Sequence, residues 1–116
     1  RFAAVEIREL AEKSSIEEEA DEILAACRGY VIALAVEGEK LSSEKFASLI
    51  KKQTDAGKEI TFLIGSSCGL AARVKQSADC RLSFSDMTLP HQLMRVVLCE
   101  QVYRAFMINA GSAYHK

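Results

Sequence analysis

The sequence predicts a single α/β domain with a mainly parallel sheet and helices on both of its faces. Stretches with apolar residues at helical spacing alternate along the chain with short apolar stretches typical of strands, and turn signals separate them. Such alternation is typical of a parallel sheet with crossover helices. The chain has 116 residues, 49% of them hydrophobic, which is enough for one domain with its own core. We therefore assign residues 1–116 to one domain.

The first half of the chain is predicted to contain two strands and two helices. Ser15 followed by Glu18 forms a capping box, which marks the start of the first helix. The stretch Tyr30 to Val36 is apolar throughout, as in strands covered on both faces, so we expect it at the centre of the sheet. The predicted elements are, in order, a strand at Phe2 to Ile7, a helix over 16–28 stopped by Gly29, a strand at Tyr30 to Val36, and a helix opened by Ser42 and Ser43 and stopped by Gly57.

The second half is predicted to end in the longest helix, from Gln92 to Asn109. Apolar residues cover most of the circumference of this helix, which indicates burial on more than one side. Because the sheet of a small domain can cover only one side, we expect a second copy of the chain on the other, most simply as a C2 homodimer. Before this helix we expect a strand at Ile60 to Ile64, a loop at Gly65 to Gly69, a helix at Leu70 to Ser77, a strand at Arg81 to Phe84 and a loop at Ser85 to Pro90.

Composition limits the classes of partner. The 15 basic and 16 acidic residues give a net charge of −1, so nucleic acid would have to meet a local patch or a partner subunit. The four cysteines form no C-x-x-C pair, which is typical of reduced thiols in a cytoplasmic protein, and with only two histidines we expect no metal site. No apolar run approaches the roughly 18 residues of a membrane span, and the first residues do not resemble a signal peptide.

The last third of the chain indicates a ligand loop. A short strand is followed by a Ser/Asp/Thr turn, which closes on Pro90, the only proline. Such a turn offers backbone donors and acceptors at the carboxyl end of a strand, where open α/β sheets usually bind ligands.

The residues of this region also carry a family resemblance. The string SFSDMTLPHQLMRVVLCEQVYRAF, followed by AYHK, closely resembles the C-terminal signature of the SPOUT-superfamily methyltransferases that modify N3 of a pseudouridine in large-subunit ribosomal RNA. Further similarity lies in YVIALAVEGEKLSSEKFASLI and EITFLIGSSCGL. The resemblance implies a C-terminal trefoil knot, a homodimer and S-adenosylmethionine as cofactor. Members of the family begin with a further strand and helix that this sequence lacks, and Ser66 stands where they usually have glycine.

The resemblance also implies the residues of the site. It assigns the catalytic and RNA-contacting roles to Arg104, Tyr114 and His115, with His115 as the candidate base because an imidazole titrates near neutral pH. The alternatives are a surface pair of Arg104 with Glu100, at i,i+4 spacing, and a frayed C-terminus. For the cofactor-binding segments the alternative is three ordinary βα turns. The residues assigned to the cofactor are Leu34, Ala35, Gly65, Ser66, Ser85, Asp86, Met87, Thr88, Leu89 and Pro90.

Two other functions remain open from the sequence. The loop Gly65 to Gly69 fits G-x-S-x-G, which would make Ser67 the nucleophile of a serine hydrolase, although no HGGG-type segment precedes it. The chain could also be a non-catalytic dimeric α/β module that binds RNA or a partner.

Overall fold

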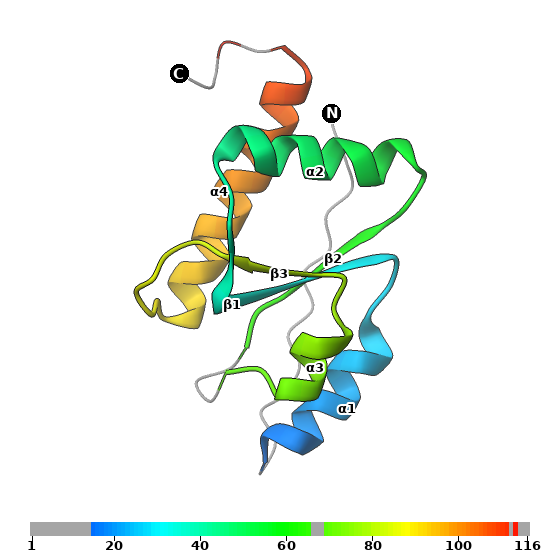
Figure 1. The fold of residues 1–116 in the computed structure, drawn as a ribbon, viewed down its shortest axis with the longest axis vertical. Coiled ribbons are helices and arrows are strands. Elements are labelled where there is room, and N and C mark those ends of the chain that lie inside the picture. Colours follow the sequence, from blue (N-terminus) through cyan, green and yellow to red (C-terminus); the bar gives the residue numbers. More distant parts are fainter. Residues whose placement is uncertain (1–14, 66–68, 112, 114–116) are drawn as a thin grey trace.

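The computed structural model describes residues 15–65, 69–111 and 113. In this part of the chain a three-stranded parallel sheet, in the order β2-β1-β3, lies between two pairs of helices (Figure 1). The predicted α/β architecture with helices on both faces is confirmed, whereas the strand predicted near the N-terminus lies outside the described residues. The elements are α1 (Ile16–Ala26), β1 (Tyr30–Lys40), α2 (Ser43–Asp55), β2 (Ile60–Leu63), α3 (Ala72–Ser77), β3 (Cys80–Ser83) and α4 (His91–Asn109).

Serine caps begin the two helices for which the sequence predicted them. The Ser15 hydroxyl accepts a hydrogen bond from the backbone N–H of Glu18 at 3.2 Å, and that of Ser42 accepts one from Lys45 at 3.1 Å. Each bond satisfies a backbone donor that has no partner within its own helix, which is worth about 1 kcal/mol. The caps thus fix the points at which α1 and α2 leave the preceding chain.

The first half of β1 supplies both cores of the molecule. Ile32 and Leu34 face the core formed with α2 and α4, while Ala33 between them faces the core formed with α1 and α3. Successive side chains of a strand point to opposite faces, so one buried strand can hold two helical layers together. The prediction of a central strand, covered on both faces, is confirmed.

The second half of β1 departs from the prediction, which ended the strand at Val36. The strand continues to Lys40, and its pairing with β3 shifts so that Leu34 and Glu39 both lie opposite Leu82. Gly38 lies against the backbone of β3, where an added Cβ would come within 2.7 Å of the carbonyl carbon of Arg81. The polar residues after Val36 looked like a turn, but they form an exposed, bulged strand instead.

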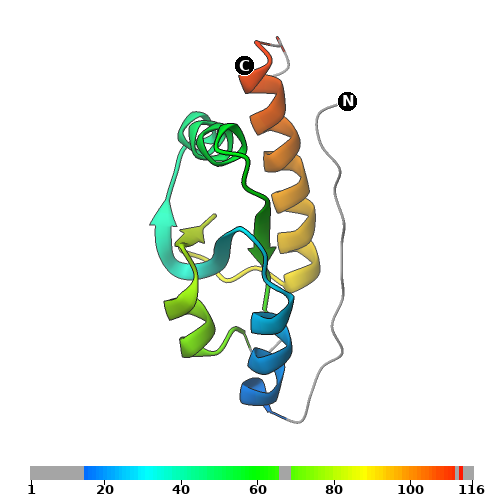
Figure 2. The ribbon, with the colours of Figure 1, turned by 90° about the vertical axis from the view of Figure 1, so that its right-hand side faces the viewer.

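The helix α4 packs on α2 with one face and leaves another face exposed. Figure 2 shows α2 end-on and α4 running across it. The Ser43 hydroxyl donates to Oε1 of Gln101 at 2.8 Å, and Nδ2 of Asn109 donates to the carbonyl oxygen of Ala47 at 3.0 Å. These two bonds fix the position of α4 relative to α2, and no sequence motif indicated them. The exposed face carries apolar side chains at helical spacing, namely Leu93, Val96 and Tyr103, with the exposed Cys99 between them.

Candidate functional site

The carboxyl ends of the three strands lie at one edge of the sheet. Ala33 pairs with Leu63 on one side of β1, and Leu34 pairs with Leu82 on the other. Parallel strands that are paired in this way end side by side, so the next residues of each strand face the same space. The segments assigned to the cofactor therefore begin side by side: Leu34 and Ala35 in the middle of β1, where its buried half ends, Gly65 after β2, and the 85–90 loop after β3.

At the end of β2, Gly65 brings two backbone segments together. An added Cβ on Gly65 would lie 2.6 Å from the carbonyl carbon of Gly69, closer than real Cβ atoms approach other groups. A larger residue would therefore push the returning loop away from the strand end. Ser66 and Ser67, the residues expected to bind the cofactor or to act as a nucleophile, lie outside the described residues.

The 85–90 loop is anchored at its start and exposed at its tip. The buried hydroxyl of Ser83 donates to the carbonyl oxygen of Ser85 at 2.9 Å and accepts from its N–H at 3.3 Å. The hydroxyl of Ser85 in turn accepts from the N–H of Met87 at 2.9 Å. The side chain of Met87 is 74% exposed, and Asp86, Thr88 and Pro90 are exposed as well. The loop thus has a fixed base and presents its polar and apolar tip to solvent.

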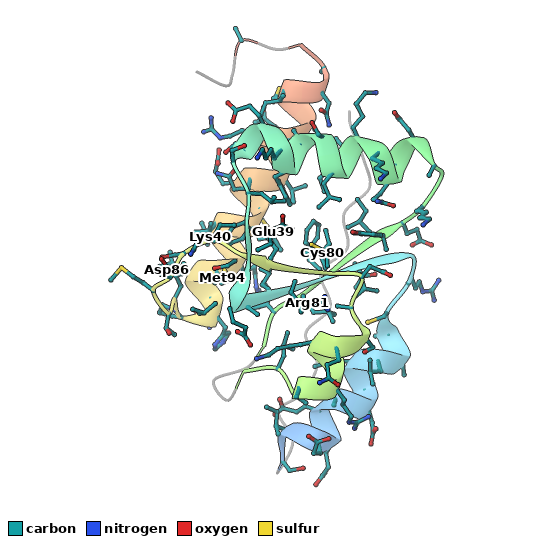
Figure 3. The ribbon with its side chains drawn as sticks, in the orientation of Figure 1. Glu39, Lys40, Cys80, Arg81, Asp86 and Met94 are labelled. Atoms are coloured by element: carbon teal, nitrogen blue, oxygen red, sulfur yellow. The ribbon has the colours of Figure 1, made fainter. Side chains whose placement is uncertain are left out.

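An ion pair between Lys40 and Asp86 joins the end of β1 to this loop. In Figure 3 the two side chains lie together on one side of the rising part of β1, whereas Glu39 lies on the other side, near Cys80. Both partners are largely exposed, so the pair is worth less than about 1 kcal/mol. Sequence reasoning missed Lys40, because the run that contains it was interpreted as a turn.

The residues expected to contact RNA are only partly described. Arg104 lies on α4 and donates from Nε and Nη2 to the two carboxylate oxygens of Glu100, both at 3.2 Å. The i,i+4 pair that the sequence offered as the alternative is therefore present. Its two parallel bonds form a bidentate contact that fixes the orientation of the guanidinium. His91 is the first residue of α4, directly after the loop and one residue before the predicted start of the helix at Gln92. Tyr114 and His115 lie outside the described residues.

A cavity of about 540 Å³ lies elsewhere, between one face of α2, the second half of β1 and the start of β3. It does not coincide with the strand ends that the resemblance assigns to the cofactor. Burial raises the pKa of the Tyr30 hydroxyl and of the Cys80 thiol in its wall, and nearby acidic groups raise both further. The hydrogen bond from Lys75 lowers the pKa of Glu37, which lies on the rim of the same cavity.

Comparison with known proteins decides the family. A family model described as "Predicted SPOUT methyltransferase" matches residues 1–115. The chain belongs to the SPOUT methyltransferases. Among curated relatives, proteins named "Ribosomal RNA large subunit methyltransferase H" from Streptococcus uberis and Streptococcus gordonii are 50% and 47% identical to the whole chain, which spans 82% of each. A protein of the same name from Levilactobacillus brevis is 58% identical over 85% of the chain and 64% of its own length.

For this SPOUT methyltransferase the predicted family is confirmed, and the comparisons favour methyl transfer over the hydrolase and the non-catalytic module. The parallel sheet agrees with the predicted fold, while the knot remains a prediction that follows from the family.

Among the described residues, no group of three or more His, Cys, Asp or Glu side chains could hold a metal ion. Within the same part of the chain, no helix is long and apolar enough to cross a membrane.

The strand ends suit the chemistry of a nucleoside sulfonium such as S-adenosylmethionine. An adenosyl group needs apolar surface for its ring and backbone or hydroxyl groups for its polar edges, and a carboxylate favours the positive sulfur. The SPOUT methyltransferase supplies apolar surface at the half-buried Ala35 and Leu89, a hydroxyl at Ser85 and, at Asp86, a carboxylate that is paired with Lys40. Leu34 is buried in the core behind them. The close approach of Gly65 to Gly69 leaves no room for a side chain at the end of β2, so the returning backbone closes this side of the site.

Proposed function

We propose that this protein transfers a methyl group from S-adenosylmethionine to N3 of a pseudouridine in large-subunit ribosomal RNA. The match to a SPOUT methyltransferase model over residues 1–115 carries the proposal. The printed names of the relatives from Streptococcus support ribosomal RNA as the substrate class. The convergence of the three strand ends supports the position of the site.

The cofactor would supply a methyl group on a positively charged sulfur, and the protein would align it with the acceptor nitrogen. Holding two reactants in line can account for several kcal/mol of the barrier, so positioning is the main task of the site. We assign it to Leu34 and Ala35, to Gly65 and Ser66, and to the 85–90 loop. The anchor of this loop on Ser83 supports the assignment, because a loop with a fixed base loses less conformational freedom when it closes on a ligand.

Removal of the N3 proton is the second task, and we assign it to the C-terminal residues. His115 would accept the proton, since an imidazole with a pKa of about 6.5 is largely neutral at pH 7.5. Tyr114 would contact the RNA beside it. Arg104 would hold a phosphate or the target base, for which its Nε and Nη2 donors would have to leave Glu100.

We also propose that the active form is a cytoplasmic homodimer. The exposed apolar stripe on α4, formed by Leu93, Val96 and Tyr103, supports a second copy of the chain as the partner of this face. The free thiols of Cys27, Cys80 and Cys99 agree with a reducing compartment. Because the net charge is −1, we expect recognition of the ribosome through a composite surface rather than tight binding to a naked RNA fragment.

The test is a methyl-transfer assay on large ribosomal subunits with radiolabelled S-adenosylmethionine. We expect incorporation into RNA by the unmodified protein and a large loss with Thr88→Pro, which changes the backbone of the 85–90 loop. The matched control is Thr54→Ala on the exposed side of α2, which should leave incorporation unchanged.

Two results would contradict this proposal. Absence of incorporation by a folded protein that binds the donor in a calorimeter would argue against ribosomal RNA as the acceptor. Equal incorporation by Thr88→Pro and the unmodified protein would remove the 85–90 loop from the site.

A further inference from the structure

The cavity between α2 and the second half of β1 is separate from the strand ends assigned to the cofactor. Its volume of about 540 Å³ falls within the range of about 300 to 1,000 Å³ that is typical of small-molecule sites. Figure 3 shows Glu39 and Cys80 on this side of β1, while Lys40 and Asp86 lie on the side of the 85–90 loop. Alternation along one strand therefore directs neighbouring residues to two different spaces.

Two lysines form the cationic wall of this cavity. Lys45 and Lys52 are seven residues apart on α2, which places them on one face of the helix, about 10 Å apart along its axis. Both are exposed and line the cavity. The adjacent Lys51, by contrast, forms an ion pair with Asp55 at 3.0 Å and does not line it. The long side chains of Lys45 and Lys52 can therefore converge on an anionic ligand in front of this face.

Three acidic residues also line the cavity, but two of them are already engaged. Glu37 accepts from Nζ of Lys75 at 2.8 Å, so its charge is balanced. Asp79 accepts from the backbone N–H of Val31 at 2.8 Å. Glu39 remains as a carboxylate on the strand side of the cavity, opposite the lysines of α2. The lining thus holds three cations, Lys45 and Lys52 on α2 and Arg81 on β3, and three carboxylates on the strand side, of which Glu39 faces the lysines.

An aromatic ring completes the lining. Tyr30 lines the cavity at the start of β1, and Nζ of Lys58 lies 6.0 Å from the centre of its ring. An aromatic surface beside lysines is the combination that binds single-stranded nucleic acid, because bases stack on the ring and phosphates pair with the cations. Glu39 adds a preference, since a carboxylate accepts a hydrogen bond from the N4 amino group of cytosine, whereas uracil carries a carbonyl oxygen at that position.

We propose that this cavity binds one nucleotide of a single RNA strand, with its phosphates on Lys45 and Lys52 and an amino-bearing base against Glu39. The inference rests on the proposed function only in taking RNA as the ligand. It adds a contact on α2, away from the strand ends where the methyl group would be transferred. The two lysines of α2 give a protein of net charge −1 local cations for the phosphates, opposite the acidic residues of the strands.

The thiol of Cys80 provides a reporter inside the cavity, because it is half-buried in the lining. We would alkylate the full chain with iodoacetamide, with and without oligocytidylate or oligouridylate of five residues, and quantify each cysteine by peptide mass mapping. Oligocytidylate should slow the alkylation of Cys80 several-fold and leave that of Cys27, at the end of α1, unaffected. Oligouridylate should protect less, and Glu39→Gln should reduce the difference between the two.

Charge variants test the same site by binding. Lys45→Gln/Lys52→Gln should weaken oligocytidylate binding roughly tenfold at 0.1 M salt and reduce the slope of log K against log salt by about 1.4, for two lost contacts to a single strand. Lys51→Gln, on the same helix but paired with Asp55, is the matched control and should change neither value. All three lysines are exposed, so thermal unfolding should show intact folds.

The outcomes separate this inference from the proposed function. Protection of Cys80 without methyl transfer to ribosomal subunits would support the cavity and contradict the proposed function. Methyl transfer with equal alkylation of Cys80 in all conditions would support the proposed function and contradict RNA binding in the cavity. Equal loss of binding in Lys51→Gln and in the double variant would also overturn the inference, because it would indicate a diffuse effect of charge rather than a site.

Discussion

The two halves of β1 have different environments although they belong to one strand. Residues 30–34 lie between the two helical layers and include the fully buried Ile32 and Ala33. Residues 35–40 turn outward past β3 and include the exposed Val36 and Lys40. The first half holds the fold together, whereas the second half separates the 85–90 loop from the cavity on α2. A change in the first half should therefore act on stability, and a change in the second mainly on the sites beside it.

The largest expected effect is the loss of packing in the first half. Ile32→Ala should lower the free energy of unfolding by about 2 to 5 kcal/mol, because it removes a buried side chain and leaves a cavity between β1 and the helices. Urea denaturation measures this change. Val36→Ala in the second half is the control and should cost less than about 1 kcal/mol. Similar costs for both variants would contradict the contrast between the two halves.

A smaller effect is expected at the point where the second half crosses β3. Gly38→Ala should destabilise the protein by about 1 to 3 kcal/mol, since its Cβ would collide with the backbone of Arg81. Hydrogen exchange should show faster exchange at Glu39 and Lys40 than in the unmodified chain. Ser48→Ala, on the exposed surface of α2, should change stability by less than about 0.5 kcal/mol. Unchanged exchange in Gly38→Ala would mean that the close approach does not hold the bulge.

The ion pair at the end of β1 should have a modest effect on the cofactor site alone. Lys40→Met should raise the KM for S-adenosylmethionine about two- to fivefold, because an exposed pair worth less than about 1 kcal/mol no longer holds Asp86. Lys40→Arg should restore most of the affinity, and high salt should reduce the difference between variants. A kcat that falls while KM stays constant would instead place Lys40 in the chemical step.

The smallest effect concerns the titration of Cys80. Burial raises the pKa of this thiol, so its alkylation should begin at higher pH in the folded protein than in the same chain unfolded in urea. A raised pKa means that the folded state holds the proton more tightly, so this contribution to stability is present below the unfolded pKa and is lost as pH rises through the folded value. Equal pH profiles in the folded and unfolded chains would contradict a raised pKa of Cys80 and its contribution to stability.

The order of the described elements could be predicted from the sequence because each has a strong local signal. The buried run from Tyr30, the serine caps and Gly57 after α2 all act over a few residues. The course of β1 after Val36 could not be predicted, because it depends on the backbone of β3, more than forty residues later in the chain. Local polarity alone favoured a turn at Glu37 and Gly38.

The candidate site, too, could be predicted from the sequence only in part. The base of the 85–90 loop follows from the Ser/Asp/Thr/Pro composition of that stretch, and the order of its residues carried the family resemblance. Its contact with Lys40 could not be found, since an ion pair between exposed side chains leaves no pattern in the sequence. The cavity on α2 was missed for the same reason. Its walls come from three elements, and none of them has a recognisable motif.

The central claim is that the neighbouring ends of β1, β2 and β3 hold the methyl donor, and hydrogen exchange tests it most directly. With S-adenosylmethionine added to the protein, peptides that contain residues 34–35, 63–65 and 83–89 should become more protected, while a peptide from the middle of α4 should not respond. Protection confined to the cavity on α2, or absent from the 83–89 peptide despite bound donor, would contradict the account.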